Sequence, residues 1–167
     1  MVEGLSQKGV LSKEELSKLP GVPSEERVRK GPVVIIECAE EIPCNPCELA
    51  CRQGAIEIGE NINDLPVLKE ELCTGCGVCI ATCPGLAIFT VDLTFSEKEA
   101  LVNMPHEFLP LPKKGEVVKC LNREGKDVSE GRIVKVLTSR KMDRTPVLSV
   151  AVPKRVAMEV RAIKLER

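Results

Sequence analysis

Aromatic side chains are scarce in this sequence of 167 residues, which has three Phe and neither Trp nor Tyr. Aromatic residues normally supply much of the buried area of a small core, so we expect another stabilising element here. The apolar content of 43% is ordinary for a globular protein and argues against disorder. The G-x-G-x-x-G pattern is also absent, which excludes the common dinucleotide-binding fingerprint.

Long hydrophobic runs are missing as well. No stretch approaches the roughly 20 apolar residues of a transmembrane helix, so no membrane insertion is expected. The first 31 residues are rich in charge and contain no apolar core of a secretory signal. These features predict a location in the reducing cytoplasm, where clustered cysteines indicate bound metal rather than disulfides.

Recognisable catalytic machinery is also lacking. The single histidine, His106, lies in a proline-rich segment without partner residues, and we expect it to be solvated or to cap a backbone group. No nucleophile–base pair, phosphate loop or paired-carboxylate motif is present. The sequence therefore predicts a chain that is not catalytic alone.

The formal net charge of −1 conceals an uneven distribution of acidic and basic residues along the chain. Residues 31–112 contain 3 basic and 13 acidic side chains, a net of −10, whereas residues 113–167 contain 15 basic and 7 acidic side chains, a net of +8. The basic tail is expected to meet an acidic partner surface or to fold back on the acidic middle. Nucleic-acid binding is disfavoured, because no aromatic stacking platform accompanies the basic residues.

Eight of the nine cysteines form two tight groups. The second group follows the C-x2-C-x2-C-x3-C-P spacing of bacterial iron–sulfur proteins, and its members are Cys73, Cys76, Cys79 and Cys83, followed by Pro84. Three close thiolates let a short loop wrap one corner of a cluster, and Gly75 and Gly77 let the backbone curl towards it. The fourth cysteine of such a run ligates the other cluster of a pair.

The first group departs from this spacing. It consists of Cys38, Cys44, Cys47 and Cys51, with three extra residues after Cys38 and with Arg52 in place of the usual proline. The insertion leaves open whether Cys38 is a ligand; without it, the site would hold a [3Fe–4S] cluster or use another ligand. The nearby carboxylates of Glu40, Glu41 and Glu48 are expected to be solvated and to influence the cluster potential by their charge.

Residues 33–91 resemble a bacterial-type ferredoxin domain with two [4Fe–4S] clusters. The resemblance implies that one cluster is held by Cys38, Cys44, Cys47 and Cys83, and the other by Cys73, Cys76, Cys79 and Cys51. Structural zinc is the main alternative, but zinc sites normally use two separated C-x2-C pairs, which these groups do not match. Cys120 stands apart in an expected strand, where it is interpreted as a small buried side chain.

The expected fold class is α+β, with a ferredoxin-like two-cluster domain followed by a small, mostly β domain. Residues 1–30 form a helical extension with helix starts at Ser12 and Ser24, residues 31–103 the cluster domain, residues 104–115 a proline-rich linker and residues 116–167 the β domain. In the last of these, strands are expected at residues 116–121, 132–138, 147–152 and 157–165.

A second resemblance covers most of the chain. The segments Gly9–Ser12, Pro23–Arg27 and Glu41–Cys47, together with the β-rich tail, are similar to the small ferredoxin-type subunits of flavin-dependent proline, hydroxyproline or sarcosine dehydrogenases. This implies an electron-transfer subunit in a hetero-oligomer, with FAD or FMN only on partner subunits and an acceptor protein or carrier beyond. The alternatives are a stand-alone decorated ferredoxin, a ferredoxin subunit of another oxidoreductase, and a structural zinc-binding or nucleic-acid adaptor.

Overall fold

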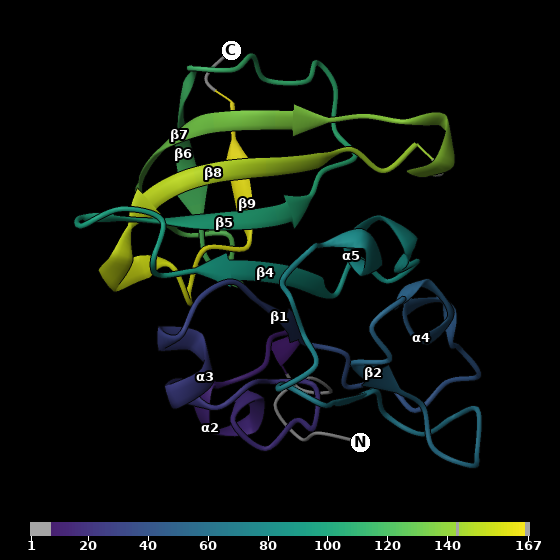
Figure 1. Ribbon diagram of the computed structural model, residues 1–167. Coiled ribbons are helices and arrows are strands. Elements are labelled where there is room, and N and C mark those ends of the chain that lie inside the picture. The colour runs from purple at the N-terminus through teal and green to yellow at the C-terminus, as the bar shows by residue number, and fades with distance from the viewer. Residues whose placement is uncertain (1–7, 143, 166–167) are drawn as a thin grey trace.

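The computed structural model describes residues 8–142 and 144–165, so residues 1–7 of the expected extension and residues 143, 166 and 167 of the expected β domain lie outside it. The chain is a mixed α/β protein with short helices and a large antiparallel sheet (Figure 1). None of the helices in the described ranges is long and apolar enough to cross a membrane. The elements in chain order are α2 (Lys13–Leu16), α3 (Glu25–Arg29), β1 (Val33–Ile36), α4 (Pro46–Ala50), β2 (Ile56–Glu57), β3 (Val67–Leu68), α5 (Val78–Thr82), β4 (Ile88–Asp92), β5 (Glu99–Pro105), β6 (Val117–Leu121), β7 (Asp127–Leu137), β8 (Val147–Pro153) and β9 (Ala162–Lys164).

The lead segment forms the two helices that its capping residues predict. The Ser12 side chain accepts a hydrogen bond from the Glu15 N–H, and the Glu15 carboxylate accepts one from the Ser12 N–H, which completes the capping box at α2. Ser24 caps α3 in the same way, through the Arg27 N–H. Buried Leu16 packs in a small cluster that reaches into the cysteine-rich part, so the lead is attached to that part of the molecule.

The cysteine-rich part has two similar halves. In the first, β1 leads through a cysteine loop and α4 to β2; in the second, β3 leads through a cysteine loop and α5 to β4. β1 pairs with β4, and β2 pairs with β3, all antiparallel. The strands of one half therefore pair with the strands of the other. The two short helices α4 and α5 lie next to each other (Figure 1).

The predicted division into two domains is not confirmed, because one sheet runs through both. Its seven strands follow the order β1-β4-β5-β8-β7-β6-β9, and every pairing is antiparallel. β5 joins the cysteine-rich part to the tail, since Val102 pairs with Val91 on one side and with Val150 on the other. The expected boundary after residue 103 falls inside this strand.

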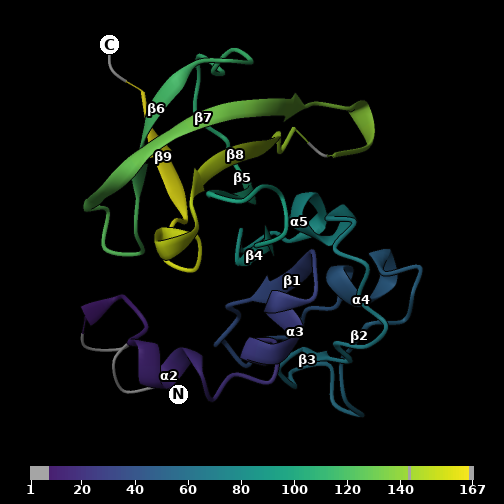
Figure 2. The ribbon, with the colours of Figure 1, turned by 60° about the vertical axis from the view of Figure 1, so that its left-hand side comes forward.

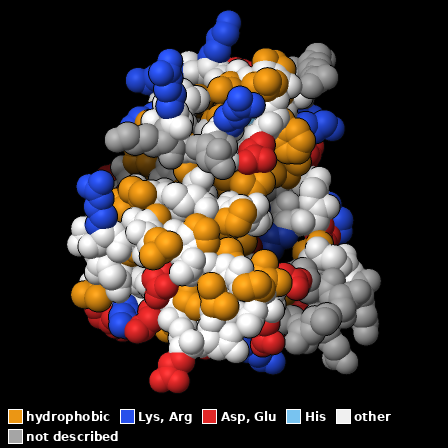
Figure 3. Space-filling view, turned by 90° about the vertical axis from the view of Figure 1, so that its right-hand side faces the viewer, with side chains coloured by type: hydrophobic (Ala, Val, Ile, Leu, Met, Phe, Trp, Pro, Cys, Tyr) orange, Lys and Arg blue, Asp and Glu red, His pale blue; other side chains and the backbone are white. Residues whose placement is uncertain are grey.

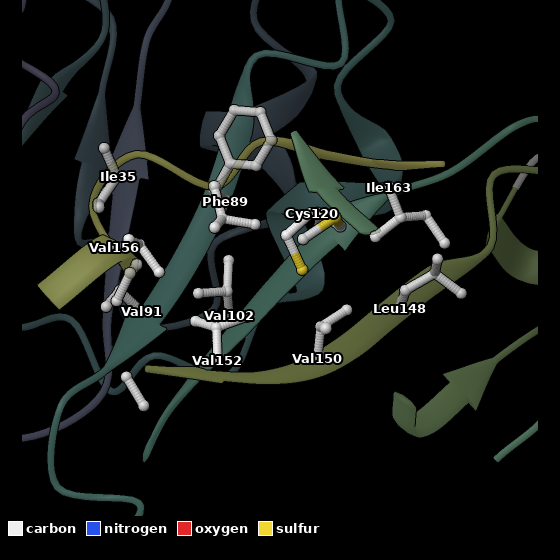
Figure 4. Packing of buried hydrophobic residues seen from close by; sticks show 14 of the residues in the cluster. Ile35, Phe89, Val91, Val102, Cys120, Leu148, Val150, Val152, Val156 and Ile163 are labelled. Carbon is white, nitrogen blue, oxygen red and sulfur yellow. The ribbon is translucent and has the colours of Figure 1, made fainter. Parts of the chain in front are cut away.

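In the tail the sheet curls, so that β6 and β9 pass behind β7 and β8 in Figure 1 and lie to one side of β5 and β8 in Figure 2. The enclosed core consists mainly of β-branched side chains, and Phe89 and Cys120 lie among them (Figure 4). The predicted strands at residues 116–121 and 147–152 are confirmed. The strand expected over residues 157–165 is wrong in its first half, where the chain turns before β9, and β7 begins at Asp127 rather than Arg132.

The expectation that His106 is solvated or caps a backbone group is wrong with respect to solvation. His106 follows β5 and is 6% exposed, with its ring packed edge-on against Phe108 at a centroid distance of 5.7 Å. Burial lowers the pKa of His106, which favours the neutral ring. Its backbone N–H donates to the Pro146 carbonyl, so the segment after β5 is fixed to the start of β8 and carries the side chain inward.

Candidate iron–sulfur centre

A first cavity gathers cysteines from both groups. Cys38, Cys44 and Cys47 line it together with Cys83, which lies 36 positions beyond Cys47 in the chain. The cavity encloses about 400 Å³, part of it open to solvent, and its walls include the apolar side chains of Ile36, Ile58 and Ile88. Despite the insertion after it, Cys38 therefore lines the same cavity as Cys44 and Cys47.

A second cavity gathers the other four thiols. Cys73, Cys76 and Cys79 line it together with Cys51 from the first group, and the space measures about 280 Å³, part of it open to solvent. Cys76 is exposed, whereas Cys79 is buried. The structure thus divides the eight thiols into the two sets that the ferredoxin resemblance implies.

Helices α4 and α5 produce this crossed arrangement. Cys47 lies in α4 and Cys51 at its C-terminal cap, and Cys79 and Cys83 occupy the same positions in α5. Both cap residues have extended backbone conformations, so the chain leaves the helix there and each cap cysteine joins the neighbouring cavity. Four residues of helix rise about 6 Å, so the two cavities are adjacent.

The loop of the second cysteine group requires glycine. Gly75 has a φ of +66°, and a Cβ atom added there would lie 2.6 Å from the Pro32 carbonyl carbon. Gly77 has a φ of +74° at the start of α5. Both backbone conformations belong to the left-handed region that favours glycine, as a tightly curled loop requires.

Backbone N–H groups point at several of the thiol sulfurs. The N–H of Val34 and that of Gly75 each donate to Cys73 Sγ over 3.4 Å, and the Ala55 N–H donates to Cys51 Sγ over 3.2 Å. In the first cavity, backbone groups at Glu40 and Glu48 make equivalent contacts with Cys38 and Cys47. Such donors stabilise negative charge on sulfur, as a metal-bound thiolate carries.

Burial strongly disfavours free thiolates at the centre of each cavity. It raises the pKa of Cys47 to about 11 and that of Cys79 to about 12, and repulsion from the neighbouring thiolates adds to both shifts. Thiols with such pKa values are protonated at neutral pH unless a cationic group binds them. Metal ligation supplies that cation and releases the protons.

A single metal ion and an iron–sulfur cluster require different arrangements of their ligands. A zinc ion needs four ligands around one point. Among residues 8–142 and 144–165, no three His, Cys, Asp or Glu side chains converge in that way. In a [4Fe–4S] cluster each thiolate binds a separate iron, so the ligands line a small volume, and four cysteines line each of the two cavities.

The remaining candidates lie as follows. Cys120 is fully buried in the tail core, close enough to Gly131 that a Cβ on that glycine would lie 2.5 Å from the sulfur, so its interpretation as a core side chain is confirmed. Glu40 and Glu41 are exposed as expected. Glu48 is only half-exposed, because its carboxylate accepts a hydrogen bond from the Ile58 N–H over 2.9 Å.

Sequence reasoning missed a buried ionic network beside the first cavity. Glu37, which precedes Cys38, binds Arg161 Nε over 2.7 Å and also pairs with Arg123. The Glu37 and Arg161 side chains are 8% and 5% exposed. Burial would raise the pKa of Glu37, but the two guanidinium groups lower it below its usual value. No local sequence pattern marks a network whose members lie 86 and 124 positions apart.

The comparisons with known proteins agree with this geometry. The family model of the 4Fe-4S dicluster domain matches residues 42–87, which include seven of the eight clustered cysteines. No solved structure matches the chain significantly.

Three curated relatives match parts of the chain. They are ABC transporter E family member 1 of Arabidopsis thaliana, 26% identical over 63% of this chain; a subunit of the ion-translocating oxidoreductase complex of Methanosarcina acetivorans, 43% identical over 28%; and Protein Pixie of Drosophila melanogaster, 29% identical over 44%. The matches cover 20%, 17% and 13% of these relatives, so the chain spans a fifth or less of their length. The cysteine-rich part of the chain is therefore similar to a ferredoxin-like 4Fe–4S domain.

Proposed function

We propose that the chain is an electron-transfer protein that holds two [4Fe–4S] clusters. The first would be held by Cys38, Cys44, Cys47 and Cys83, and the second by Cys51, Cys73, Cys76 and Cys79. Bound clusters of this type supply one-electron redox couples, and the surrounding protein sets their potentials. The observation that carries the proposal is the exchange of Cys51 and Cys83 between the two cavities.

The chain's own residues would prepare both sites for single-electron chemistry. The buried apolar walls limit access of water, and the N–H groups aimed at Cys73 and Cys51 favour the thiolate form of the ligand. The shared helices α4 and α5 keep the sites adjacent, so one electron can pass between them over a short path.

The cysteine exchange gives a direct test. We expect Cys51→Ser and Cys76→Ser to alter the electron paramagnetic resonance (EPR) signal of the same reduced cluster, although 25 positions separate them in the chain. Cys47→Ser and Cys83→Ser should alter the other signal. Cys120→Ala is the matched control and should leave both signals intact. If Cys51→Ser and Cys47→Ser altered the same signal, the assignment would be contradicted.

We further propose that the electron donor is a flavoprotein that docks on the face near the two cavities. The cysteine-rich part of the chain carries several exposed apolar side chains: Ile42, Leu49, Ile62, Leu72 and Val78. Figure 3 views the molecule from this side, with hydrophobic side chains gathered in its middle and lower part and Lys and Arg mainly at the top. A cluster of exposed apolar residues is typical of a protein interaction site.

The class of the partner rests on the sequence. The resemblance to subunits of flavin-dependent amino-acid dehydrogenases favours a donor that carries FAD or FMN. The relative from Methanosarcina acetivorans is named as a subunit of an oxidoreductase complex, which supports work within an assembly more generally. A decorated ferredoxin that acts alone remains the alternative, and it would not need an apolar face of this kind.

A further inference from the structure

Arg27 in the lead helix α3 contacts the loop of the second cysteine group directly. Its Nη2 atom donates to the Cys73 carbonyl over 2.6 Å, and its Nε atom donates to the Glu70 carbonyl over 3.0 Å. The same guanidinium donates to the carbonyls of Gly31 and Pro32 over 3.2 and 3.0 Å. One side chain therefore joins the segment before β1 to the segment that contains Cys73.

These four hydrogen bonds of Arg27, here called the clamp, hold Pro32 and Val34 close to Cys73 and its loop. Pro32 lies against Gly75 so closely that a Cβ on the glycine would clash with it. Two residues further on, the Val34 N–H donates to Cys73 Sγ. By fixing Pro32 relative to Cys73, Arg27 fixes the approach of both the Val34 donor and the glycine loop.

The helix that carries Arg27 is fixed from the other side by Glu70. The Glu70 carboxylate accepts hydrogen bonds from the Ser24 N–H and hydroxyl over 2.7 and 2.8 Å, and the Ser24 side chain caps α3 at the Arg27 N–H. The Glu70 carboxylate is thus directed at Ser24. Among the described residues, no carboxylate forms an ion pair with Arg27.

The charge of Arg27 is therefore not neutralised by direct pairing, and the side chain is half-buried beside a residue assigned as a cluster ligand. Reduction adds one negative charge to an iron–sulfur cluster. A nearby cation stabilises the reduced form, and its effect is larger where water is partly excluded.

We propose that Arg27 is a positioning residue for the second cluster: it clamps the Cys73 loop and raises the reduction potential of the cluster held there. The inference rests on the proposed function, since it needs a cluster in the second cavity. It gives the lead segment a role in this molecule, as a brace and an electrostatic determinant of one redox site.

The test is a redox titration of the full-length chain followed by EPR spectroscopy. In Arg27→Gln, we expect the oxidised-to-reduced ratio of the second cluster at a fixed potential to rise at least about tenfold, which corresponds to a potential lower by about 59 mV for a one-electron couple. The first cluster should change much less. The Cys76→Ser variant identifies which signal belongs to the second cluster.

Arg29→Gln is the matched control, because it removes the same charge from the same helix at a side chain that is 74% exposed. Solvent and salt screen such a charge, so both potentials should stay unchanged. Arg27→Lys keeps the cation without the four-point clamp. It should keep the potential near that of the wild type but release iron from the second cluster to a chelator faster.

The outcomes separate this inference from the proposed function. Selective loss of the second cluster in Arg27→Gln, with recovery in Arg27→Lys, supports the same role because lysine restores the cation. Unchanged potentials, equal shifts of both clusters, or an equal effect of Arg29→Gln would overturn the inference. A wild-type chain without iron and sulfide would instead refute the proposed function.

Discussion

The buried network of Glu37, Arg123 and Arg161 connects the first cysteine group to the tail at the scale of single residues. The Arg161 guanidinium also donates to the Val160 carbonyl over 2.6 Å and stacks over the Phe89 ring, with its central carbon 4.8 Å from the ring centroid. Burial lowers the pKa of Arg161 to about 10, and the Glu37 charge opposes this shift. Even so, the guanidinium remains charged at neutral pH, and the pair stays ionised.

Glu37→Gln should destabilise the protein strongly, because it leaves two guanidinium groups without their carboxylate. Removal of one partner of a buried pair costs about 3–5 kcal/mol. For a chain of this size, a loss of about 3 kcal/mol lowers the melting temperature by about 6 °C or more. Circular dichroism during heating measures the shift.

Glu25→Gln provides the control for this prediction. Glu25 pairs with Arg29 over 3.3 Å, but the two side chains are 92% and 74% exposed. Exposed pairs of this kind contribute little, so the melting temperature should hardly change. Equal melting temperatures for Glu37→Gln and the wild type would show that the network has no net stabilising role.

At the scale of secondary structure, signals within a few residues of the chain predict the helices well. The strands that depend on distant pairing partners are harder to predict. The capping residues Ser12 and Ser24 mark their helices because a side-chain cap acts within three residues of the chain. Strand β5 was not predicted, although every second residue in it, Ala100, Val102 and Met104, is buried. Outward-facing Leu101 is also apolar, which removes the contrast on which a period of two depends.

Helix α4 also allows a test of the proposed docking face. Leu49 is 77% exposed on this helix, between Cys47 and Cys51. When the tagged chain is isolated from its native cells, we expect a stoichiometric amount of flavin to accompany it. Leu49→Lys should reduce the retained flavin at least about fivefold, since losing an interface contact worth about 1 kcal/mol weakens binding by about that factor.

Phe108→Lys is the control for the docking face. Phe108 is also 77% exposed, but it lies in the segment after β5 and not in the cysteine-rich part that carries Leu49. The flavin retained by this variant should match the wild type. An equal loss in both variants, or wild-type protein without flavin, would contradict docking of a flavoprotein on this face.

At the scale of the whole molecule, the acidic and basic parts of the chain partly neutralise each other. Tail residues Arg123 and Arg161 bind Glu37, and Arg132 pairs with Glu99 of β5 over 3.1 Å. From the sequence, the basic tail was expected either to fold back on the acidic middle in this way or to meet an acidic partner surface. The continuous sheet, which places the tail strands beside β5, is what brings these charges together.

The second cysteine group and its glycines are recognisable in the sequence, because these residues lie within eleven positions of one another. The sequence alone left open whether Cys38 belongs to the first site, since the insertion after it obscures the motif. Neither Arg27 nor Glu37 stood out, because each acts through contacts more than 40 positions away along the chain. Long-range pairing of this kind has no signature in a single sequence.

The central claim is that the eight thiols hold two four-iron clusters, and the metal content of the full-length chain tests it most directly. Protein isolated without oxygen should contain about eight iron atoms and about eight acid-labile sulfides per chain. A chain that contains no iron and sulfide, or that contains zinc in their place, would contradict the account.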